Sequence, residues 1–203
     1  MPFVQPAGIH TSRVVRPKIE LLLPVVTLPG DEDAAATINA SIRFAARTLL
    51  EDQGSLEDPR SQMLGYYEIK NNQKGVLSLS QFNYAFTGGA HGLTLQRSLT
   101  FINKEGKPVP LSGLFKKKAN YVSRLSELVA IQIKQRGIET LQPFTAIRAD
   151  QDYYIADRAL IIWFSVYEIT PYVYGFPYFP ISVYELSDLI KEDGPLGVMD
   201  VND

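Results

Sequence analysis

The sequence predicts an α+β fold, in which an antiparallel β-sheet meander is packed by two main helices and a short C-terminal helix. Two segments, 31–50 and 119–136, carry apolar residues at helical spacing. Between them, residues 66–101 alternate apolar with polar side chains, as strands with one covered face do. A nearly continuous apolar run over 159–167 is typical of a central strand covered on both faces.

The chain is expected to begin with a flexible leader, residues 1–13, which contains His10. Residues 14–26 are predicted to be extended, because Pro17 and Pro24 exclude a helix interior there. Pro24 has no backbone N–H to donate, so it suggests an edge strand.

The first helix is predicted to start after Gly30. Asp31, Glu32 and Asp33 can cap it and place negative charge at its positive end. Its apolar positions recur at spacings of four, three and four, and are Ile38, Ile42, Ala45 and Leu49. We expect this apolar face to pack on a sheet.

The middle of the chain predicts three consecutive strands. Residues 66–70 and 76–86 form an expected hairpin around the connection 71–75, with Gly75 where a positive φ is needed. Alternation over 93–101 continues the antiparallel meander. The loop 86–92 therefore joins two strands at one rim of the sheet.

The C-terminal part predicts a helix over 119–136 that Gly137 ends. Trp163, inside the apolar run, is assigned to the core. A short helix is expected over 182–190, followed by a loosely attached tail, 191–203.

No internal repeat or linker is visible, so one globular unit is expected. We divide it into the leader 1–13, a strand–helix half 14–60, a C-terminal half 61–190 packed against it, and the tail 191–203.

Composition excludes several classes of site. The formal charge is −2, from 20 Lys and Arg against 22 Asp and Glu, so the chain has no overall field that would attract nucleic acid. The absence of cysteine rules out disulfides and thiolate metal sites. No stretch approaches the ~20 apolar residues of a membrane span, so no membrane insertion of this chain is expected. The N-terminus lacks signal-peptide features, which leaves open a cytoplasmic protein or an excised ectodomain.

A glycine-rich loop is the first candidate site. His91 lies among Gly88, Gly89 and Gly92, which give the loop the backbone freedom that a ligand-contacting loop needs. Alternatively, the glycines only make a tight connection that His91 holds by hydrogen bonds. The sequence lacks a nucleophile elbow and a second histidine at metal-ligand spacing, so no catalytic residue, metal site or cofactor is predicted.

An aromatic and proline-rich stretch, 172–180, is the second candidate site. Rigid prolines and flat amphipathic rings form surfaces with a low ordering cost, as in protein-recognition or sugar-stacking loops. The alternative is that these rings pack over the end of the core.

Five ordered motifs carry a resemblance to a known family. They are Gly88 to Gly92, Ser98 to Phe101, Leu111 to Phe115, Tyr167 to Gly175, and Ile181 to Leu186. Together they resemble the extracytoplasmic domain of the RsiV-type anti-sigma factors of Gram-positive bacteria, a family largely of unknown function. The same domain is also found beside polysaccharide deacetylase domains.

The resemblance implies an α+β, extracytoplasmic domain that binds rather than catalyses. Its ligand would be a lysozyme-like protein or a peptidoglycan-type glycan of the cell wall. The expected ligand-binding residues are Thr87, Gly88, Gly89, His91, Tyr172, Tyr174, Phe176 and Tyr178. Two alternatives stay open: a cell-wall-active hydrolase that uses His91, and a cytoplasmic interaction protein.

Overall fold

The computed structural model describes residues 4–200, which divide into two compact units with their boundary between Pro108 and Val109. We call residues 4–108 the N-terminal unit and residues 109–200 the C-terminal unit. This division differs from the expected one at residue 60, because the strands after residue 61 pair with the N-terminal strands. Within residues 4–200, no helix is long and apolar enough to cross a membrane.

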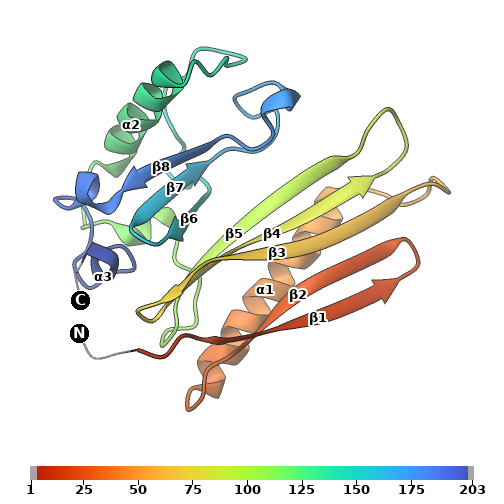
Figure 1. The fold of residues 1–203 in the computed structure, drawn as a ribbon, viewed down its shortest axis with the longest axis horizontal. Coiled ribbons are helices and arrows are strands. Elements are labelled where there is room, and N and C mark those ends of the chain that lie inside the picture. Colours follow the sequence, from red (N-terminus) through yellow and green to blue (C-terminus); the bar gives the residue numbers. More distant parts are fainter. Residues whose placement is uncertain (1–3, 201–203) are drawn as a thin grey trace. The chain divides into compact units, whose positions relative to one another are not determined.

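The N-terminal unit is a five-stranded sheet with the order β1-β2-β3-β4-β5 (Figure 1). The strands are β1 (Gly8–Arg16), β2 (Ile19–Thr27), β3 (Gln62–Gln73), β4 (Val76–Phe86) and β5 (Leu93–Ile102). All pairs are antiparallel except β2 with β3, which run parallel. The predicted α+β class with an antiparallel meander is confirmed.

The first two strands form a hairpin that the sequence did not reveal. β1 and β2 are joined by Pro17 and Lys18, and Lys18 has φ +64°. Residues 8–13, expected in a flexible leader, belong to β1 because β2 supplies them with a partner over its full length. Positions 1–3 of that leader lie outside the described residues.

Pro24 lies in β2, which has neighbouring strands on both sides. The parallel register between β2 and β3 covers only Ile19–Leu21, so at Pro24 the paired strand is β1 alone. The predicted edge position therefore holds locally, although β2 is not the outermost strand.

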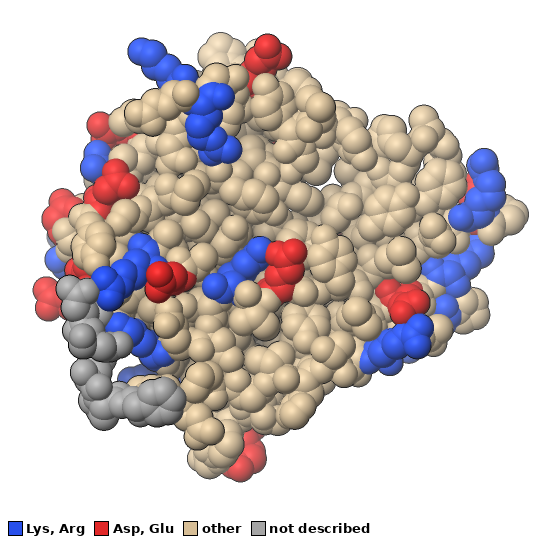
Figure 2. Space-filling model, viewed as in Figure 1, with Lys and Arg blue, Asp and Glu red and all other residues tan. Residues whose placement is uncertain are grey.

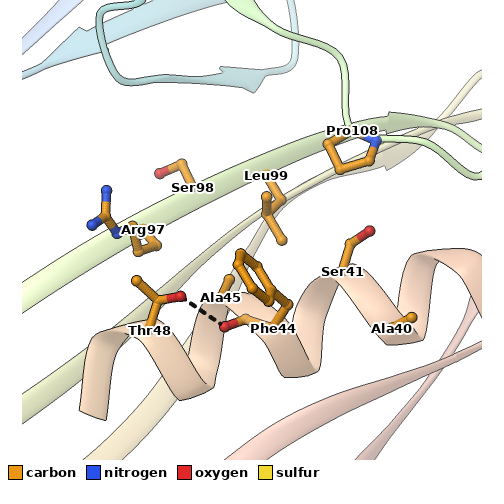
Figure 3. A pocket seen from close by; sticks show the side chains of 9 residues that line it. All are labelled: Ala40, Ser41, Phe44, Ala45, Thr48, Arg97, Ser98, Leu99 and Pro108. Atoms are coloured by element: carbon orange, nitrogen blue, oxygen red, sulfur yellow. Dashed lines mark hydrogen bonds between the residues drawn. The ribbon is translucent and has the colours of Figure 1, made fainter. Parts of the chain in front are cut away.

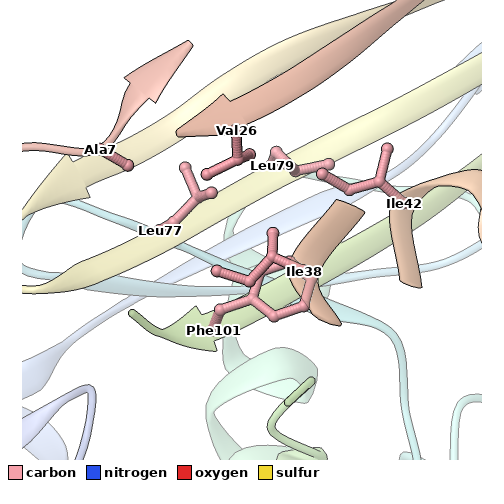
Figure 4. Packing of buried hydrophobic residues seen from close by; sticks show 7 residues of the cluster. All are labelled: Ala7, Val26, Ile38, Ile42, Leu77, Leu79 and Phe101. Carbon is pink, nitrogen blue, oxygen red and sulfur yellow. The ribbon is translucent and has the colours of Figure 1, made fainter. Parts of the chain in front are cut away.

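Helix α1 (Glu32–Asp52) covers one face of this sheet. Its start is as predicted, since the Asp31 carboxylate accepts a hydrogen bond from the Ala34 amide at 3.2 Å. The predicted apolar face is buried. Figure 4 shows its core cluster, formed by Ala7, Val26, Ile38, Ile42, Leu77, Leu79 and Phe101.

The predicted hairpin between β3 and β4 is confirmed, with a tighter connection than expected. Gln73 pairs with Val76, so only Lys74 and Gly75 form the turn. Both have positive φ, +53° and +73°, as two-residue hairpin turns of the I′ type require.

The C-terminal unit holds helix α2 (Tyr121–Gln135) and a three-stranded antiparallel sheet of order β6-β7-β8. The strands are β6 (Tyr153–Ala156), β7 (Ala159–Trp163) and β8 (Tyr178–Ser182). β7 is central, and Trp163 has no exposed surface, so both predictions are confirmed. Gly137 has φ +61° after the helix, which is the predicted stop.

Short helices complete this unit, and they correct the expected tail. They are the 3₁₀ helices η1 (Leu111–Leu114), η2 (Tyr172–Tyr174) and η3 (Val183–Leu186), and the one-turn helix α3 (Gly197–Asp200). The expectation of a loosely attached tail is wrong for residues 191–200, because Leu196 and Met199 are buried. Positions 201–203 lie outside the described residues.

Candidate functional site

The C-terminal unit presents a compact turn of aromatic side chains, formed by Tyr167 and residues 171–175. We call it the tyrosine turn. The Tyr174 amide donates to the Pro171 carbonyl, and the Gly175 amide to the Tyr172 carbonyl, each at 3.0 Å. Gly175 leaves the turn with φ +61° and ψ −127°, a backbone region that glycine occupies at no steric cost. Pro171 and Gly175 therefore fix both ends of the turn.

The side chains of the tyrosine turn face solvent. Val173, in the middle of η2, is 85% exposed, and Tyr167 is 51% exposed. Tyr172 and Tyr174 are also exposed, and the rings of Tyr167 and Tyr172 lie 5.6 Å apart between centroids. The turn thus displays three tyrosines and one branched aliphatic side chain on a short, constrained backbone.

Tyr167 adopts a left-handed backbone with φ +67°. Such a conformation is unfavourable for a bulky residue and is often retained at functional sites. Its neighbours hold it there: the Glu168 carboxylate accepts from the Ser165 amide at 2.7 Å and pairs with the Arg148 guanidinium. Arg148 also reaches the Asp152 carboxylate at 3.2 Å, so a charged network supports the strained residue.

A neighbouring segment anchors the tyrosine turn from the side. The Glu139 amide donates to the Tyr174 hydroxyl at 3.2 Å, and the Leu141 amide donates to the Ile169 carbonyl at 2.9 Å. These bonds fix the turn without covering its exposed rings.

The two remaining aromatic candidates, Phe176 and Tyr178, pack inward instead. Both are partly buried against a core cluster that contains Trp163. The Phe176 ring meets Trp163 edge to face at 5.9 Å, and Tyr178 meets Tyr154 in the same way, also at 5.9 Å. The two interpretations of the aromatic stretch therefore apply to different residues. Tyr172 and Tyr174 lie on the surface, whereas Phe176 and Tyr178 pack against the core.

The glycine-rich loop belongs to the other unit, at the β4–β5 connection. Thr87, Gly89 and His91 are exposed, while Gly88 is half-buried. Gly88 and Gly89 have φ of +92° and +129°, so both need glycine for the backbone path. The Nδ1 atom of His91 lies 3.0 Å from the Gly92 carbonyl oxygen, as the structural interpretation of His91 anticipated.

A charged cluster lies beside this loop. A Cβ atom at Gly88 would lie 2.5 Å from a carboxylate oxygen of Asp58, so the two segments are in close contact. Arg60 donates to Asp58 from its side chain and from its amide, and these bonds, with Lys18 nearby, lower the pKa of Asp58 to about 2. The Arg60 guanidinium also lies 5.8 Å from the Phe86 ring centroid. Asp58 therefore carries a full negative charge at neutral pH.

The structure brings Tyr167, Tyr172, Val173 and Tyr174 together in one unit, and the loop of Thr87 to His91 with Asp58 and Arg60 in the other. Sequence reasoning missed Val173 and Asp58 as site residues. In the sequence, Tyr167 was singled out only as the first residue of a family motif. Its positive φ has no signature in the sequence.

Charged side chains on one face of the molecule are mixed in sign (Figure 2). On the face shown in Figure 2, basic and acidic side chains are interspersed rather than gathered into a patch of one sign. Among residues 4–200, no group of three or more His, Asp or Glu side chains is placed to hold a metal ion.

Each of the two units matches a different family model. Residues 17–94 match the family model described as Deacetylase PdaC, and residues 112–184 match the model described as Protein of unknown function (DUF3298). The boundary between the two matches falls where the two compact units divide.

Two solved structures share the fold. A DUF3298 family member from Bacteroides fragilis superposes with a TM-score of 0.71, at 14% identity, over 96% of this chain and 97% of its own. A DUF3298 family protein from Pseudomonas aeruginosa superposes with a TM-score of 0.63, at 17% identity, over 94% of this chain and 95% of its own.

A curated relative agrees with the family that the motifs indicate. The anti-sigma-V factor RsiV of Bacillus subtilis (strain 168) is 30% identical over 188 residues, which is 85% of this chain. The chain spans 65% of the length of RsiV. Over most of its length the chain is therefore similar to the anti-sigma factor RsiV, in agreement with the RsiV-type family that its motifs resemble.

Proposed function

We propose that this chain is a non-enzymatic binding module of RsiV-like type, and that its tyrosine turn recognises a lysozyme-like protein. The observation that carries the proposal is the exposure of Tyr167, Tyr172, Val173 and Tyr174 on a constrained turn. Tyrosine offers large amphipathic contact area at a low cost in conformational entropy, and it is enriched at protein interfaces.

The chemistry of the turn favours a protein over a peptidoglycan-type glycan. Sugars stack on the flat faces of aromatic rings, whereas a branched aliphatic side chain gains most by entering an apolar pocket. Val173 is the most exposed side chain of the turn and is aliphatic. A folded protein partner can provide such a pocket and can accept hydrogen bonds from the surrounding tyrosine hydroxyls.

The glycine-rich loop is a second contact surface in this proposal. Thr87, Gly89 and His91 are exposed there, and the pairing of Asp58 with Arg60 fixes the segment beside the loop. The relative RsiV is named as an anti-sigma factor, which supports a regulatory role for ligand recognition by this module.

The test is a calorimetric titration with hen egg-white lysozyme. The double variant Tyr172→Ala with Tyr174→Ala should raise Kd by about 30-fold or more, as the loss of a central aromatic anchor does. Its thermal stability should change little, because both side chains are exposed and the backbone bond from Leu141 to Ile169 still anchors the turn when the Tyr174 hydroxyl is lost.

Tyr184→Ala is the matched control, since Tyr184 is an exposed tyrosine of the same unit outside the turn. It should leave Kd unchanged. An unchanged Kd for the double variant, or an equal loss for Tyr184→Ala, would contradict the proposal. Binding of soluble peptidoglycan fragments in place of lysozyme would also overturn the choice of a protein ligand.

A further inference from the structure

A groove of about 800 Å³ lies in the N-terminal unit between helix α1 and strand β5 (Figure 3). One wall is formed by α1 from Ala40 to Thr48, and the other by Arg97, Ser98 and Leu99 of β5. Pro108 closes one end. Phe44 stands in the groove on the helix side, with its ring beside Leu99 and 73% of the residue exposed.

The groove offers apolar surface because its polar atoms already have partners. The hydroxyls of Ser41 and Thr48 donate to carbonyls of their own helix, each at 3.1 Å. Arg97 donates to the Asp52 carboxylate at 2.8 Å. An occupant would therefore meet the Phe44 ring, alanine methyl groups and Leu99 rather than free hydrogen-bonding side chains.

The strand wall of the groove is the edge of the sheet. Within the part of the chain that the structure describes, β5 is the outermost strand of the five-stranded sheet, and β4 pairs with one of its two sides. On the other side, Pro108 forms a single antiparallel bridge with Phe101. The protein's own backbone thus occupies one end of this edge in extended form, and the edge before Phe101 continues along the groove.

The two edges of the sheet differ in their protection. Proteins guard exposed edges against strand pairing with charged side chains or proline. β1 carries two arginines along its nine residues: Arg13, which pairs with Glu20 at 2.8 Å, and Arg16. β5 has no proline, and its one charged residue, Arg97, is engaged with Asp52. A smaller groove beside β1 is lined in part by Arg16, Arg43 and Arg47, whereas Arg97 is the one charged residue that lines the groove beside β5.

We propose that this groove binds an extended segment of another polypeptide, which adds to β5 as an antiparallel strand along residues 93–99. Backbone hydrogen bonds to the edge would supply affinity, and alternate apolar side chains would enter the groove against Phe44 and supply specificity. The tyrosine turn lies in the other unit, so this proposal does not depend on it. The glycine-rich loop precedes β5 in the same unit, but the proposed strand pairs with β5 and not with that loop.

A free segment suits the groove better than a second copy of the chain. In a pairing of β5 with a second β5, side chains such as Leu99 would already pack on their own core. They could not fill the groove of the partner. A free strand directs every second side chain into it.

Peptides that bind the whole chain are selected from a phage-displayed library of random linear decapeptides. One selected peptide is then synthesised, and its Kd is measured by fluorescence anisotropy. The selected peptides should alternate apolar with other residues. Phe44→Asp should raise the Kd of the selected peptide by about tenfold or more, because a charge then lies in the apolar groove. Val15→Asp, an exposed apolar position on the opposite edge strand β1, is the control and should leave Kd unchanged.

Amide hydrogen exchange supplies an independent readout. Alternate amides between Leu93 and Leu99 point away from β4, and bound peptide should slow their exchange by about tenfold or more. Ala40→Glu, at another exposed position of the helix wall, repeats the test if Phe44→Asp fails to fold. Selection of no peptide, binding that both groove variants leave intact, or protection of these amides only by self-association would overturn the proposal.

Discussion

The side-chain amide of Asn39 takes the place of a strand partner for Val26. The Val26 amide donates to Asn39 Oδ1, and Asn39 Nδ2 donates to the Val26 carbonyl, both at 2.8 Å. At this point β2 has already left its parallel register with β3, which ends at Leu21. A helix residue therefore satisfies both backbone groups of a buried strand residue and ties α1 to the sheet.

Asn39→Ala should destabilise the N-terminal unit by about 1–3 kcal/mol, because two backbone groups of Val26 lose their partners. Urea unfolding followed by circular dichroism measures this change. Ser41→Ala is the control, since the Ser41 hydroxyl bonds only within its own helix and its loss should cost little. Equal effects of the two substitutions would show that the Asn39 bonds contribute nothing specific.

The charged state of Asp58 should make stability depend on pH in an acidic window. Hydrogen bonds from Arg60 lower the pKa of Asp58 from 3.8 to about 2. The side chain of Arg60 makes the largest contribution, and its backbone amide makes the next. The folded state therefore binds this proton less readily than the unfolded state. The resulting stabilisation is fully present above pH 3.8 and is lost as the pH falls towards 2.

Asp58→Asn removes this contribution. The difference in denaturation midpoint between the unmodified chain and the variant should shrink as the pH falls through this window. The pair should also be sensitive to salt, because the Arg60 side chain is exposed. A constant difference across the window would contradict the assignment.

Gly88→Ala should strain the glycine-rich loop and disturb Asp58 together. Alanine at φ +92° is unfavourable, and its Cβ would lie 2.5 Å from an Asp58 carboxylate oxygen. We expect a loss of about 1–3 kcal/mol and a raised pKa of Asp58, as its carboxylate moves away from Arg60.

Carbon-detected NMR titration of the Asp58 carboxyl measures this pKa in the variant. Gly89→Ala also has a positive φ but meets no atom within 4 Å, so it should leave the pKa of Asp58 unchanged. The contact between the two segments would be refuted by the same pKa in both variants.

At position 167, a glycine variant should be more stable than an alanine variant, which is the reverse of the usual order. At φ +67°, alanine keeps the left-handed penalty of about 1–2 kcal/mol, whereas glycine escapes it. Tyr167→Gly should therefore be more stable than Tyr167→Ala, by about 1 kcal/mol in thermal unfolding. A less stable glycine variant would mean that the backbone at this position is not left-handed in solution.

Local patterns in the sequence were sufficient for much of the fold. The acidic cap and apolar spacing located α1, and Gly75 located the hairpin between β3 and β4. The hairpin of β1 and β2 was missed because its turn, Pro17 and Lys18, places a non-glycine residue at positive φ. The packing of Leu196 and Met199 was missed because it depends on contacts that no local pattern encodes.

The candidate site was predicted only in part, for a related reason. Composition identified 172–180 as either an interaction segment or a core segment but could not separate the two. That separation depends on the contact of Phe176 with Trp163, which lies on a different strand. The exposed residues are those that η2 turns away from this contact.

The most direct measurement is a calorimetric titration of the unmodified chain with hen egg-white lysozyme at two salt concentrations. The proposed recognition by the tyrosine turn predicts saturable binding that persists at the higher salt concentration, because the contacts are mainly aromatic and apolar. Absence of saturable binding, or binding that vanishes when the salt concentration is raised, would contradict it.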